Sequence, residues 1–258
     1  MKLKGAVALV TGSNQGIGRG LVEVLLERGA AKVYATARRP ETLAAICALD
    51  MARVIPLKLD IVIESDRRAA ASAASDVTLL INNAGIPGDD EVAQRRFVAA
   101  PTLDDARHVM ETDFWATAEM CRAFIPVLLK NGGGIEGAAA IANILSIGAL
   151  FCLPEYATYC AAKSAAAVMT TALRAELSPA LLVSGVFTAG VETRMSMKNG
   201  IPKMSPVEHA HQVLSAIEQC QEDIFSGSNA EEIRDAIRKD PKAFERDRIA
   251  RFRESPLA

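Results

Sequence analysis

A short apolar strand, a glycine-rich turn and a helix start follow one another early in this sequence, and this order most constrains the fold. Residues 6–10 (AVALV) form a continuous apolar run, typical of a strand buried on both faces of a parallel sheet. Residues 11–18 (TGSNQGIG) then supply three glycines, and an amphipathic segment continues to Gly29. Glycines let a backbone approach a pyrophosphate, and the free N–H groups of a helix start face it. The pattern therefore predicts a dinucleotide site at the first turn.

Strand-like and helix-like segments alternate along the rest of the chain. Further strands are indicated at 32–36, 54–59, 77–81, 138–146, 181–187 and 224–225. Helical spacing of apolar residues occurs between them, at about 40–49, 69–75, 103–130, 156–177 and 206–221. This alternation predicts an α/β fold with a Rossmann-type, doubly wound parallel sheet of about seven strands and helices on both faces. Because no linker or repeat divides the chain, we expect a single NAD(P)-binding domain over residues 1–258.

Composition argues against several other classes of protein. The formal charge of −2 at neutral pH gives no indication of a nucleic-acid partner. No apolar run reaches the ~18 residues of a membrane span, and we expect no signal peptide. The five cysteines form no C-x-x-C pair, which fits free thiols in a reducing, cytoplasmic compartment. His209 and His211 have no third ligand close in sequence, so we predict an ordinary helix there and no metal site.

The end of the second strand bears on the choice of cofactor. In dinucleotide folds an acidic residue at this place holds the ribose 2′-hydroxyl, whereas an arginine accommodates a 2′-phosphate. This chain has Arg38 and Arg39 there and no acid, which favours NADP. The other interpretation is surface charge ahead of a helix that starts at Pro40. Asp60, after the third strand, either bonds an adenine amino group or caps the next helix.

A tyrosine and a lysine four residues apart form a candidate catalytic pair. Tyr159 and Lys163 fall on one face of the predicted 156–177 helix, and Ser146 ends the strand before it. A phenol titrates near ~10, and a nearby ammonium lowers that pKa toward the range of a general acid. Ser146 is placed to hydrogen-bond the reacting oxygen. The pattern predicts a proton-transfer site, although a Tyr/Lys pair by itself is usually a solvated helix face.

In this order and at these intervals, the motifs resemble the short-chain dehydrogenase/reductase family over roughly residues 4–206. The shared elements are Thr11-Gly12-x-x-x-Gly16-x-Gly18, Asp60, Asn82-Asn83-Ala84-Gly85, Ser146 and Tyr159-x-x-x-Lys163. The resemblance implies that Tyr159 is the general acid/base and that Ser146 orients the carbonyl or alcohol oxygen. It implies that Lys163 holds the nicotinamide ribose and lowers the Tyr159 pKa. Cofactor contacts are then expected from Gly12, Ser13, Gln15, Gly16, Ile17, Gly18, Arg38, Asp60, Ile61, Asn83, Ala84, Tyr159, Lys163, Val191 and Thr193.

Three features depart from the family pattern. The family's fourth catalytic residue is an asparagine in the long helix, where this chain has Asp113. An ionised carboxylate cannot donate a hydrogen bond, and its charge would raise the Tyr159 pKa. The family's Pro-Gly after the sixth strand is Thr188-Ala189 here, and an alanine would crowd the tight turn that glycine allows. Residues 135–140 resemble a short insertion ahead of the fifth strand.

The resemblance implies hydride transfer between NADP(H) and a small, apolar carbonyl or alcohol substrate. We expect residues 188–206 to form a lid over that substrate and residues 229–253 to form a charged helical tail. The aliphatic side chains of the expected lid are Met195, Met197, Ile201 and Met204. Family members are often dimers or tetramers built on two long helices, here 112–130 and 156–177. The alternative, which Asp113 and Thr188-Ala189 favour, is a catalytically weak nucleotide-binding protein that acts as a sensor or subunit.

Overall fold

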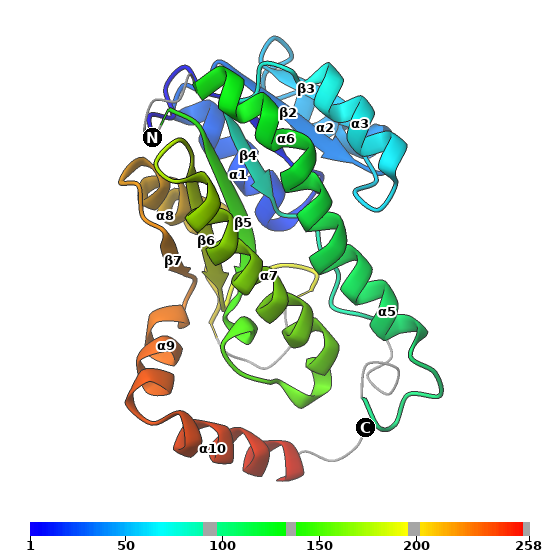
Figure 1. Ribbon diagram of the computed structural model, residues 1–258, viewed down its shortest axis with the longest axis vertical. Coiled ribbons are helices and arrows are strands. Elements are labelled where there is room, and N and C mark those ends of the chain that lie inside the picture. The colour runs from blue at the N-terminus through cyan, green and yellow to red at the C-terminus, as the bar shows by residue number, and fades with distance from the viewer. Residues whose placement is uncertain (90–96, 133–137, 196–201, 255–258) are drawn as a thin grey trace.

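The strands of the computed structural model form one seven-stranded parallel sheet with helices on both faces (Figure 1). The structure describes residues 1–89, 97–132, 138–195 and 202–254. The strands are β1 (Val7–Val10), β2 (Lys32–Ala37), β3 (Val54–Lys58), β4 (Leu79–Asn82), β5 (Ala140–Ser146), β6 (Leu182–Thr188) and β7 (Asp223–Ser226). Their spatial order is β3-β2-β1-β4-β5-β6-β7, which reverses between β1 and β4. The predicted doubly wound α/β fold is therefore confirmed.

The helices lie where the apolar periodicity predicted them, with shifts at their ends. They are α1 (Gly16–Glu27), α2 (Ala44–Cys47), α3 (Glu64–Ala73), α5 (Asp104–Met110), α6 (Ala116–Gly132), α7 (Ala157–Leu177), α8 (Pro206–Glu218), α9 (Ala230–Lys239) and α10 (Pro241–Glu254). The helix expected at 40–49 is a 3-10 turn, Pro40–Leu43, followed by the single turn of α2. Between α5 and α6 the chain takes a π-helical turn, Glu111–Trp115, which the sequence did not predict.

Two apolar cores cover the two faces of the sheet. On one face α1 and α8 pack over the central strands, with Leu25 and Leu214 fully buried. On the other face α6 buries Met120 and Phe124 against Leu80 of β4. Each fully buried side chain of this size contributes about 1.5–3 kcal/mol relative to exposure. The cores fix the strands in register, so that the carboxyl ends of β1, β4, β5 and β6 meet at one edge.

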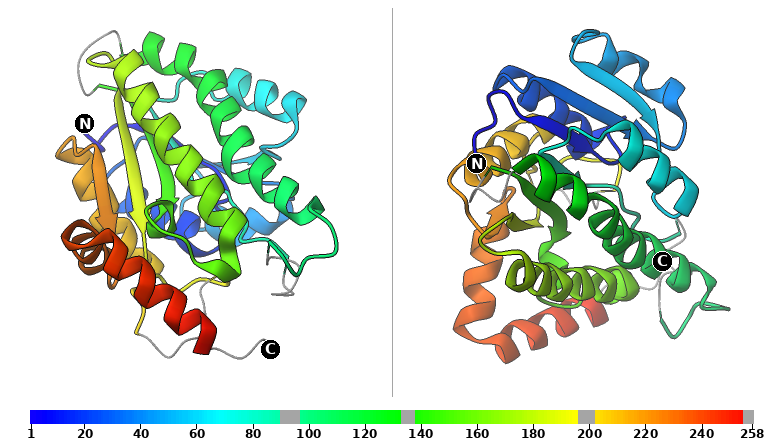
Figure 2. Two further views of the ribbon diagram at one scale, coloured as in Figure 1. Left: turned by 60° about the horizontal axis from the view of Figure 1, so that its bottom comes forward. Right: turned by 45° about the horizontal axis from the view of Figure 1, so that its top comes forward.

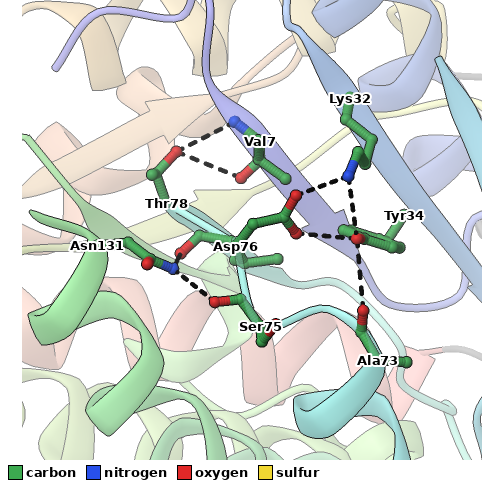
Figure 3. Close-up of polar contacts among 9 residues, drawn as sticks. Val7, Lys32, Tyr34, Ala73, Ser75, Asp76, Thr78 and Asn131 are labelled. Atoms are coloured by element: carbon green, nitrogen blue, oxygen red, sulfur yellow. Dashed lines mark hydrogen bonds and ion pairs between the residues drawn. The ribbon is translucent and has the colours of Figure 1, made fainter.

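The amino end of the sheet is closed by polar side chains that bind one another and the backbone (Figure 3). Lys32 Nζ lies 2.6 Å from Asp76 Oδ2, and the Tyr34 hydroxyl donates to Asp76 Oδ1 at 2.8 Å. Thr78 Oγ1 accepts the Val7 N–H at 3.1 Å. Asn131, at the end of α6, donates to two backbone carbonyls of the 75–77 turn at 3.0 and 2.9 Å. These contacts tie the starts of β1, β2 and β4 to the ends of α3 and α6.

At the opposite end, α9 and α10 continue beyond the carboxyl ends of the strands (Figures 1 and 2). They correspond to the expected charged tail at 229–253. Of the expected lid, residues 196–201 lie outside the described residues, as do residues 135–137 of the expected insertion, and Ala140 is already the first residue of β5. No helix within the described ranges combines the length and apolar character needed to cross a bilayer.

Candidate active site

The glycine-rich turn between β1 and α1 forms the floor of a cavity. Gly12 and Gly16 have positive φ angles of 65° and 55°, which L side chains rarely adopt. A Cβ on Gly18 would lie 2.2 Å from the Gly12 carbonyl oxygen, so α1 can approach the turn only because this residue is glycine. Gln15, the N-cap residue of α1, makes no side-chain hydrogen bond to the helix start. The first N–H groups of α1 thus remain open to an anion.

The end of β4 holds this turn in place. The Asn83 amide donates to the carbonyl oxygens of Thr11 and Gly12 at 2.8 and 3.1 Å. Thr11 Oγ1 accepts the N–H groups of Asn83 and Ala84 at 2.8 and 2.9 Å. Asn83 therefore contributes to the site by positioning the turn. The sequence motif gave no sign that Thr11 would be the hub of these contacts.

The cavity has a volume of about 1030 Å³ and opens at the carboxyl edge of the sheet. Most of the residues predicted for the site line it: Gly12, Gln15, Gly16, Ile17, Arg38, Asp60, Ile61, Asn83, Ala84, Asp113, Ser146, Tyr159, Lys163, Val191 and Thr193. Ser13 and Gly18 are not among the lining residues. Ser13 is fully buried, and its hydroxyl donates to Val10 O and accepts the Thr36 N–H, so its side chain joins β1 to β2.

Two arginines and an aspartate stand at one end of the cavity. Arg38 and Arg39 follow β2 and are exposed, and the nearest carboxylate oxygen to Arg39 Nε, from Glu41, is 4.0 Å away. Asp60 Oδ1 accepts the Val62 N–H at 3.1 Å, which orders the turn before α3. This contact lies in the turn and does not cap α3, whose N-cap residue is Ile63 without a side-chain cap bond, so the helix-capping role considered for Asp60 is not seen. Asp60 also lines the cavity, so the contact leaves room for an adenine interaction.

The expected catalytic side chains come together at the junction of β5 and α7. Ser146 ends β5 and Tyr159, on α7, is half-buried; both line the cavity, and the Ser146 hydroxyl oxygen accepts the Gly148 N–H at 3.1 Å. One turn further along α7, Lys163 Nζ lies 5.6 Å from the centre of the Tyr159 ring. Lys163 Nζ also donates to the Ile144 carbonyl oxygen of β5 at 3.2 Å. The helical spacing of Tyr159 and Lys163 and the end of β5 thus bring the three groups to one wall of the cavity.

The electrostatics at Tyr159 differ from the expectation. Burial raises the pKa of Tyr159; the Lys163 ammonium lowers it, the Asp113 carboxylate raises it further, and the Ser146 hydroxyl lowers it. The resulting pKa lies above the ordinary value of a phenol. The expected lowering by Lys163 is present but is outweighed in this structure, because burial and Asp113 act in the opposite direction.

Asp113 lies in the π-helical turn and forms a buried ion pair with Lys163. Its Oδ2 is 3.2 Å from Lys163 Nζ, and both side chains are almost inaccessible, at 0% and 7% exposed. Its Oδ1 accepts the Ile86 N–H at 2.8 Å, and the carboxylate packs against Gly85. Burial raises the Asp113 pKa despite the attraction of Lys163. Burial also lowers the Lys163 pKa, but the Asp113 and Tyr159 charges outweigh this and leave it above its ordinary value.

The Thr188-Ala189 substitution causes no backbone strain. The left-handed conformation at this turn belongs to the next residue, Gly190, with φ at 63°, and among the described non-glycine residues only Cys220 has a positive φ. The Thr188 hydroxyl lies 3.1 Å from Nε2 of His209, a fully buried residue of α8. Burial lowers the His209 pKa to about 4, so its imidazole is neutral at pH 7.

One wall of the cavity was not predicted from the sequence. The loop after β5 contributes Phe151, Leu153 and Tyr156, and the tail contributes Ile233 of α9 and Arg248 of α10. The charged pattern of the tail indicated a solvated helix, because periodicity does not reveal which distant loop a helix packs against. Phe244 of α10 meets Phe151 edge to face with ring centres 5.0 Å apart, a contact that only the fold reveals.

A nicotinamide dinucleotide fits the donor set of this cavity. The open helix start and the glycine turn suit a pyrophosphate, and the exposed arginines suit a 2′-phosphate. Lys163 and Tyr159 line the opposite end, where a nicotinamide ribose would meet them. By contrast, the described residues hold no group of three or more His, Cys, Asp or Glu side chains suited to a metal ion.

Comparison with known proteins agrees with this geometry. The family model for short chain dehydrogenases matches residues 6–203. A crystal structure of a short chain dehydrogenase from Burkholderia cenocepacia, in complex with NADP, superposes with a TM-score of 0.84. It is 40% identical in sequence, and the alignment covers 94% of this chain and 97% of that one.

Named relatives are more distant in sequence. A Drosophila melanogaster protein, dehydrogenase/reductase SDR family protein 7-like, is 30% identical over 209 residues. That match covers 76% of this chain and spans 60% of the relative's length. The NADP-dependent 3-hydroxy acid dehydrogenase of Schizosaccharomyces pombe is 30% identical over 213 residues, with 76% of this chain and 75% of that protein covered.

Proposed function

This chain belongs to the short-chain dehydrogenase/reductase family of oxidoreductases, and on that premise we propose that it transfers a hydride between NADP(H) and a small carbonyl or alcohol substrate with an apolar body. The observation that carries the proposal is the convergence of Ser146, Tyr159 and Lys163 on one wall of the cavity. When bound, the nicotinamide supplies the hydride. The chain supplies the proton and the orientation of the reacting oxygen.

Each of the three side chains has a role that its position supports. Tyr159 donates its phenolic proton to the carbonyl oxygen in reduction and accepts it in alcohol oxidation. Ser146 holds that oxygen by donating its hydroxyl proton, while its own oxygen accepts the Gly148 N–H. Lys163 stabilises the phenolate through its ammonium charge and binds the ribose. Asp113 holds Lys163 in place through the ion pair and is therefore a positioning residue.

A preference for NADP over NAD is part of the proposal. Arg38 and Arg39 follow β2 at the cavity rim, and no acidic residue follows β2 before Glu41. An arginine beside a 2′-phosphate forms charge-assisted hydrogen bonds. The NADP named in the Burkholderia cenocepacia complex and in the relative from Schizosaccharomyces pombe supports the same choice.

The cofactor preference can be inverted at the end of β2. We expect the double variant Ala37→Asp, Arg38→Ile to favour NADH, because an acid there binds the 2′-hydroxyl and repels a 2′-phosphate. Each lost charge-assisted bond costs about 1.5–3 kcal/mol, or roughly 10- to 100-fold in affinity. Dissociation constants for NADPH and NADH measured by fluorescence titration test this. A double variant that keeps the NADPH preference would place the 2′-phosphate elsewhere.

A catalytically weak nucleotide-binding protein is the second candidate, and the buried Asp113–Lys163 pair favours it. The pair commits the lysine charge to a carboxylate and raises the Tyr159 pKa. Steady-state NADPH oxidation over a panel of aldehydes and ketones, set beside cofactor affinity measured directly, separates the two functions. Turnover supports the reductase, whereas tight NADPH binding with no turnover of any carbonyl supports the sensor or subunit.

We also propose a homodimer or homotetramer built on α6 and α7. Large apolar side chains are exposed on these helices and on the π-helical turn before α6, namely Trp115, Leu129 and Val168, at 54%, 37% and 72%. Size-exclusion chromatography with light scattering tests the oligomeric state, and a monomer at micromolar concentration would contradict it.

A further inference from the structure

The wall of the cavity formed by the tail and the loop after β5 is largely apolar, with Tyr156 and Asn229 as its uncharged polar members. Phe151, Leu153 and Ile233 give it an aliphatic and aromatic surface. Arg248, on α10, lines the same cavity. The Arg248 side chain is 31% exposed, so part of its guanidinium stays hydrated, and the cost of desolvation applies to its buried Nε.

The position of Arg248 is set by aromatic packing. Its guanidinium carbon lies 5.0 Å from the centre of the Phe244 ring, one helical turn earlier on α10. Phe244 is in turn fixed against Phe151 of the loop after β5. This stack joins the tail to the loop that follows Ser146, so the guanidinium is held at a defined place relative to the catalytic wall.

Arg248 is incompletely paired. Its Nε is buried and has no hydrogen-bond partner among the described residues. The nearest carboxylate, Asp247, is 3.5 Å from its Nη2, and Asp247 is closer to Arg251, at 2.9 Å. One carboxylate therefore serves two guanidinium groups, and a buried N–H of Arg248 is left without an acceptor.

More basic than acidic side chains line the cavity as a whole. Its carboxylates are Asp60, Asp113 and Glu192, and its lysines and arginines are Arg38, Arg39, Lys163, Arg194, Lys203 and Arg248. Asp113 is committed to Lys163, and Asp60 lies with the arginines of the other end. The charged side chain that α10 contributes to this lining is Arg248, and its neighbour Asp247 is shared with Arg251.

We propose that Arg248 binds an anionic oxygen group of the substrate, so that the substrate is an oxo or hydroxy compound with an apolar body and a terminal oxyanion. The inference rests on the proposed reductase function and narrows its substrate class. The Nε and Nη2 groups of a guanidinium form a planar fork that matches a carboxylate or a phosphate in a bidentate manner. The apolar wall accommodates the carbon chain between the oxyanion and the carbonyl that Tyr159 protonates.

Matched substrates and variants of the full-length chain test the inference. Oxo acids with three to six carbons between the carbonyl and the carboxylate are compared with their methyl esters and with phosphate monoesters of the matching hydroxyketones. The variants are Arg248→Met, which keeps an apolar stem, and Arg248→Lys, which keeps a point charge. Arg246→Met is the control, because Arg246 is exposed on the same helix and is not among the residues lining the cavity. Thermal midpoints establish that each variant is folded.

For wild type we expect kcat/KM with NADPH to be about 10- to 100-fold higher for one of the two anionic series than for the esters, mainly through KM. Arg248→Met should abolish that difference while kcat/KM for the esters stays unchanged. Arg248→Lys should keep part of the difference, and Arg246→Met should keep all of it. A preference for phosphates over carboxylates would identify the oxyanion as phosphate.

Equal use of acids and esters by wild type, or equal losses with both in Arg248→Met, would overturn the inference while leaving the reductase function intact. Absence of turnover with any carbonyl would instead contradict the reductase. The affinity of the NADPH-bound protein for the oxo acids, measured by calorimetry, then tests Arg248 alone, and an unchanged affinity in Arg248→Met would overturn its role.

Discussion

The two ends of the sheet treat polar side chains in opposite ways. At the amino end, Lys32, Tyr34 and Asp76 bind one another, and Asn131 caps a turn with both of its N–H groups directed to carbonyls (Figure 3). The buried side-chain atoms that lack a hydrogen-bond partner among the described residues are Asn82 Oδ1, Thr112 Oγ1, Asp113 Oδ2, His209 Nδ1, Asn229 Oδ1 and Arg248 Nε. All six belong to the carboxyl end, and four of these residues line the cavity; Asp113 Oδ2, 3.2 Å from Lys163 Nζ, is the one that has a counter-charge.

This difference separates polar groups that stabilise the fold from polar groups that await a ligand. A satisfied network costs little and fixes the register of strands and helices, whereas an unpaired buried group costs about 1–3 kcal/mol. A protein retains such a cost where a bound molecule supplies the missing partner. The comparison predicts that substitutions at the carboxyl end change activity or pH dependence, and that substitutions at the amino end change only stability, by a small amount.

The largest effect is expected for Tyr159→Phe. Phenylalanine keeps the ring and its packing but has no proton to donate, and general acid catalysis is worth ~10²- to 10⁴-fold in rate. We expect turnover to fall by that factor, with NADPH affinity and the free energy of unfolding close to those of wild type. Steady-state kinetics, cofactor titration and urea unfolding measure the three quantities. Turnover within a few-fold of wild type would exclude Tyr159 as the proton donor.

Asp113→Asn should affect both stability and activity. The substitution leaves the buried Lys163 ammonium without a counter-charge, and loss of one partner of a buried pair costs about 3–5 kcal/mol. We expect the free energy of unfolding to fall by about that amount at pH 7. The double variant Asp113→Asn, Lys163→Met is the control, because it removes both charges. It should recover part of the loss, and no recovery would show that the cost lies in packing against Gly85.

The same substitution tests the electrostatics of catalysis. The Asp113 charge raises the Tyr159 pKa, so its removal should shift the alkaline limb of alcohol oxidation to lower pH. Expressed as a fraction of its own maximum, the activity of the variant near pH 7 should then exceed that of wild type. The pH–rate profiles of both forms give the answer, and an identical limb in the two would mean that Asp113 does not influence the phenol.

The outcome at Asp113 illustrates what the sequence could and could not predict. Continuous apolar runs were sufficient to predict the strands, and helical periodicity was sufficient to predict α1. The same local patterns placed Ser146, Tyr159 and Lys163 together. The π-helical turn was missed because its i→i+5 pairing has no signature in composition. Asp113, the partner of Lys163, lies in this turn.

Long-range packing determines the other features that the sequence did not predict. Arg248 is about a hundred residues from Ser146 in sequence, and only the packing of α10 on the loop after β5 brings it to the cavity. In the same way, Ser13 belongs to the glycine motif, but the pairing of β1 with β2 buries it. The motif identified the turn correctly and did not distinguish its lining residues from its supporting ones.

His209 offers a pH-dependent test of the carboxyl end. Its folded pKa is about 4, below the ~6.5 of an unfolded histidine, so the unfolded chain binds more protons between these values. Stability should therefore fall as the pH is lowered from 6.5 to 4, with a loss of about 2 kcal/mol by pH 5. In His209→Gln this part of the pH dependence of the unfolding free energy should disappear. Urea unfolding at pH 7.5 and at pH 5 measures it. His211→Gln, at a more exposed position of α8, should keep the wild-type dependence; equal slopes in wild type and His209→Gln would contradict the assignment.

The smallest effect is expected at the amino end, for Asp76→Asn. The Lys32 and Asp76 side chains are 34% and 44% exposed, so water and salt screen the pair despite its 2.6 Å contact. An asparagine oxygen can still accept from Tyr34, so the free energy of unfolding at pH 7 should fall by less than about 1 kcal/mol. Burial raises the Asp76 pKa, but the bonds from Lys32 and Tyr34 outweigh it and leave this pKa below its ordinary value. The ionised carboxylate therefore stabilises the fold above the unfolded pKa, and this stabilisation is lost as the pH falls through the folded pKa. The difference between wild type and variant should thus shrink in acid and in high salt, while kcat/KM stays unchanged. A change in kcat/KM of more than a few-fold would show that the amino end also serves the reaction, and the contrast between the two ends would fail.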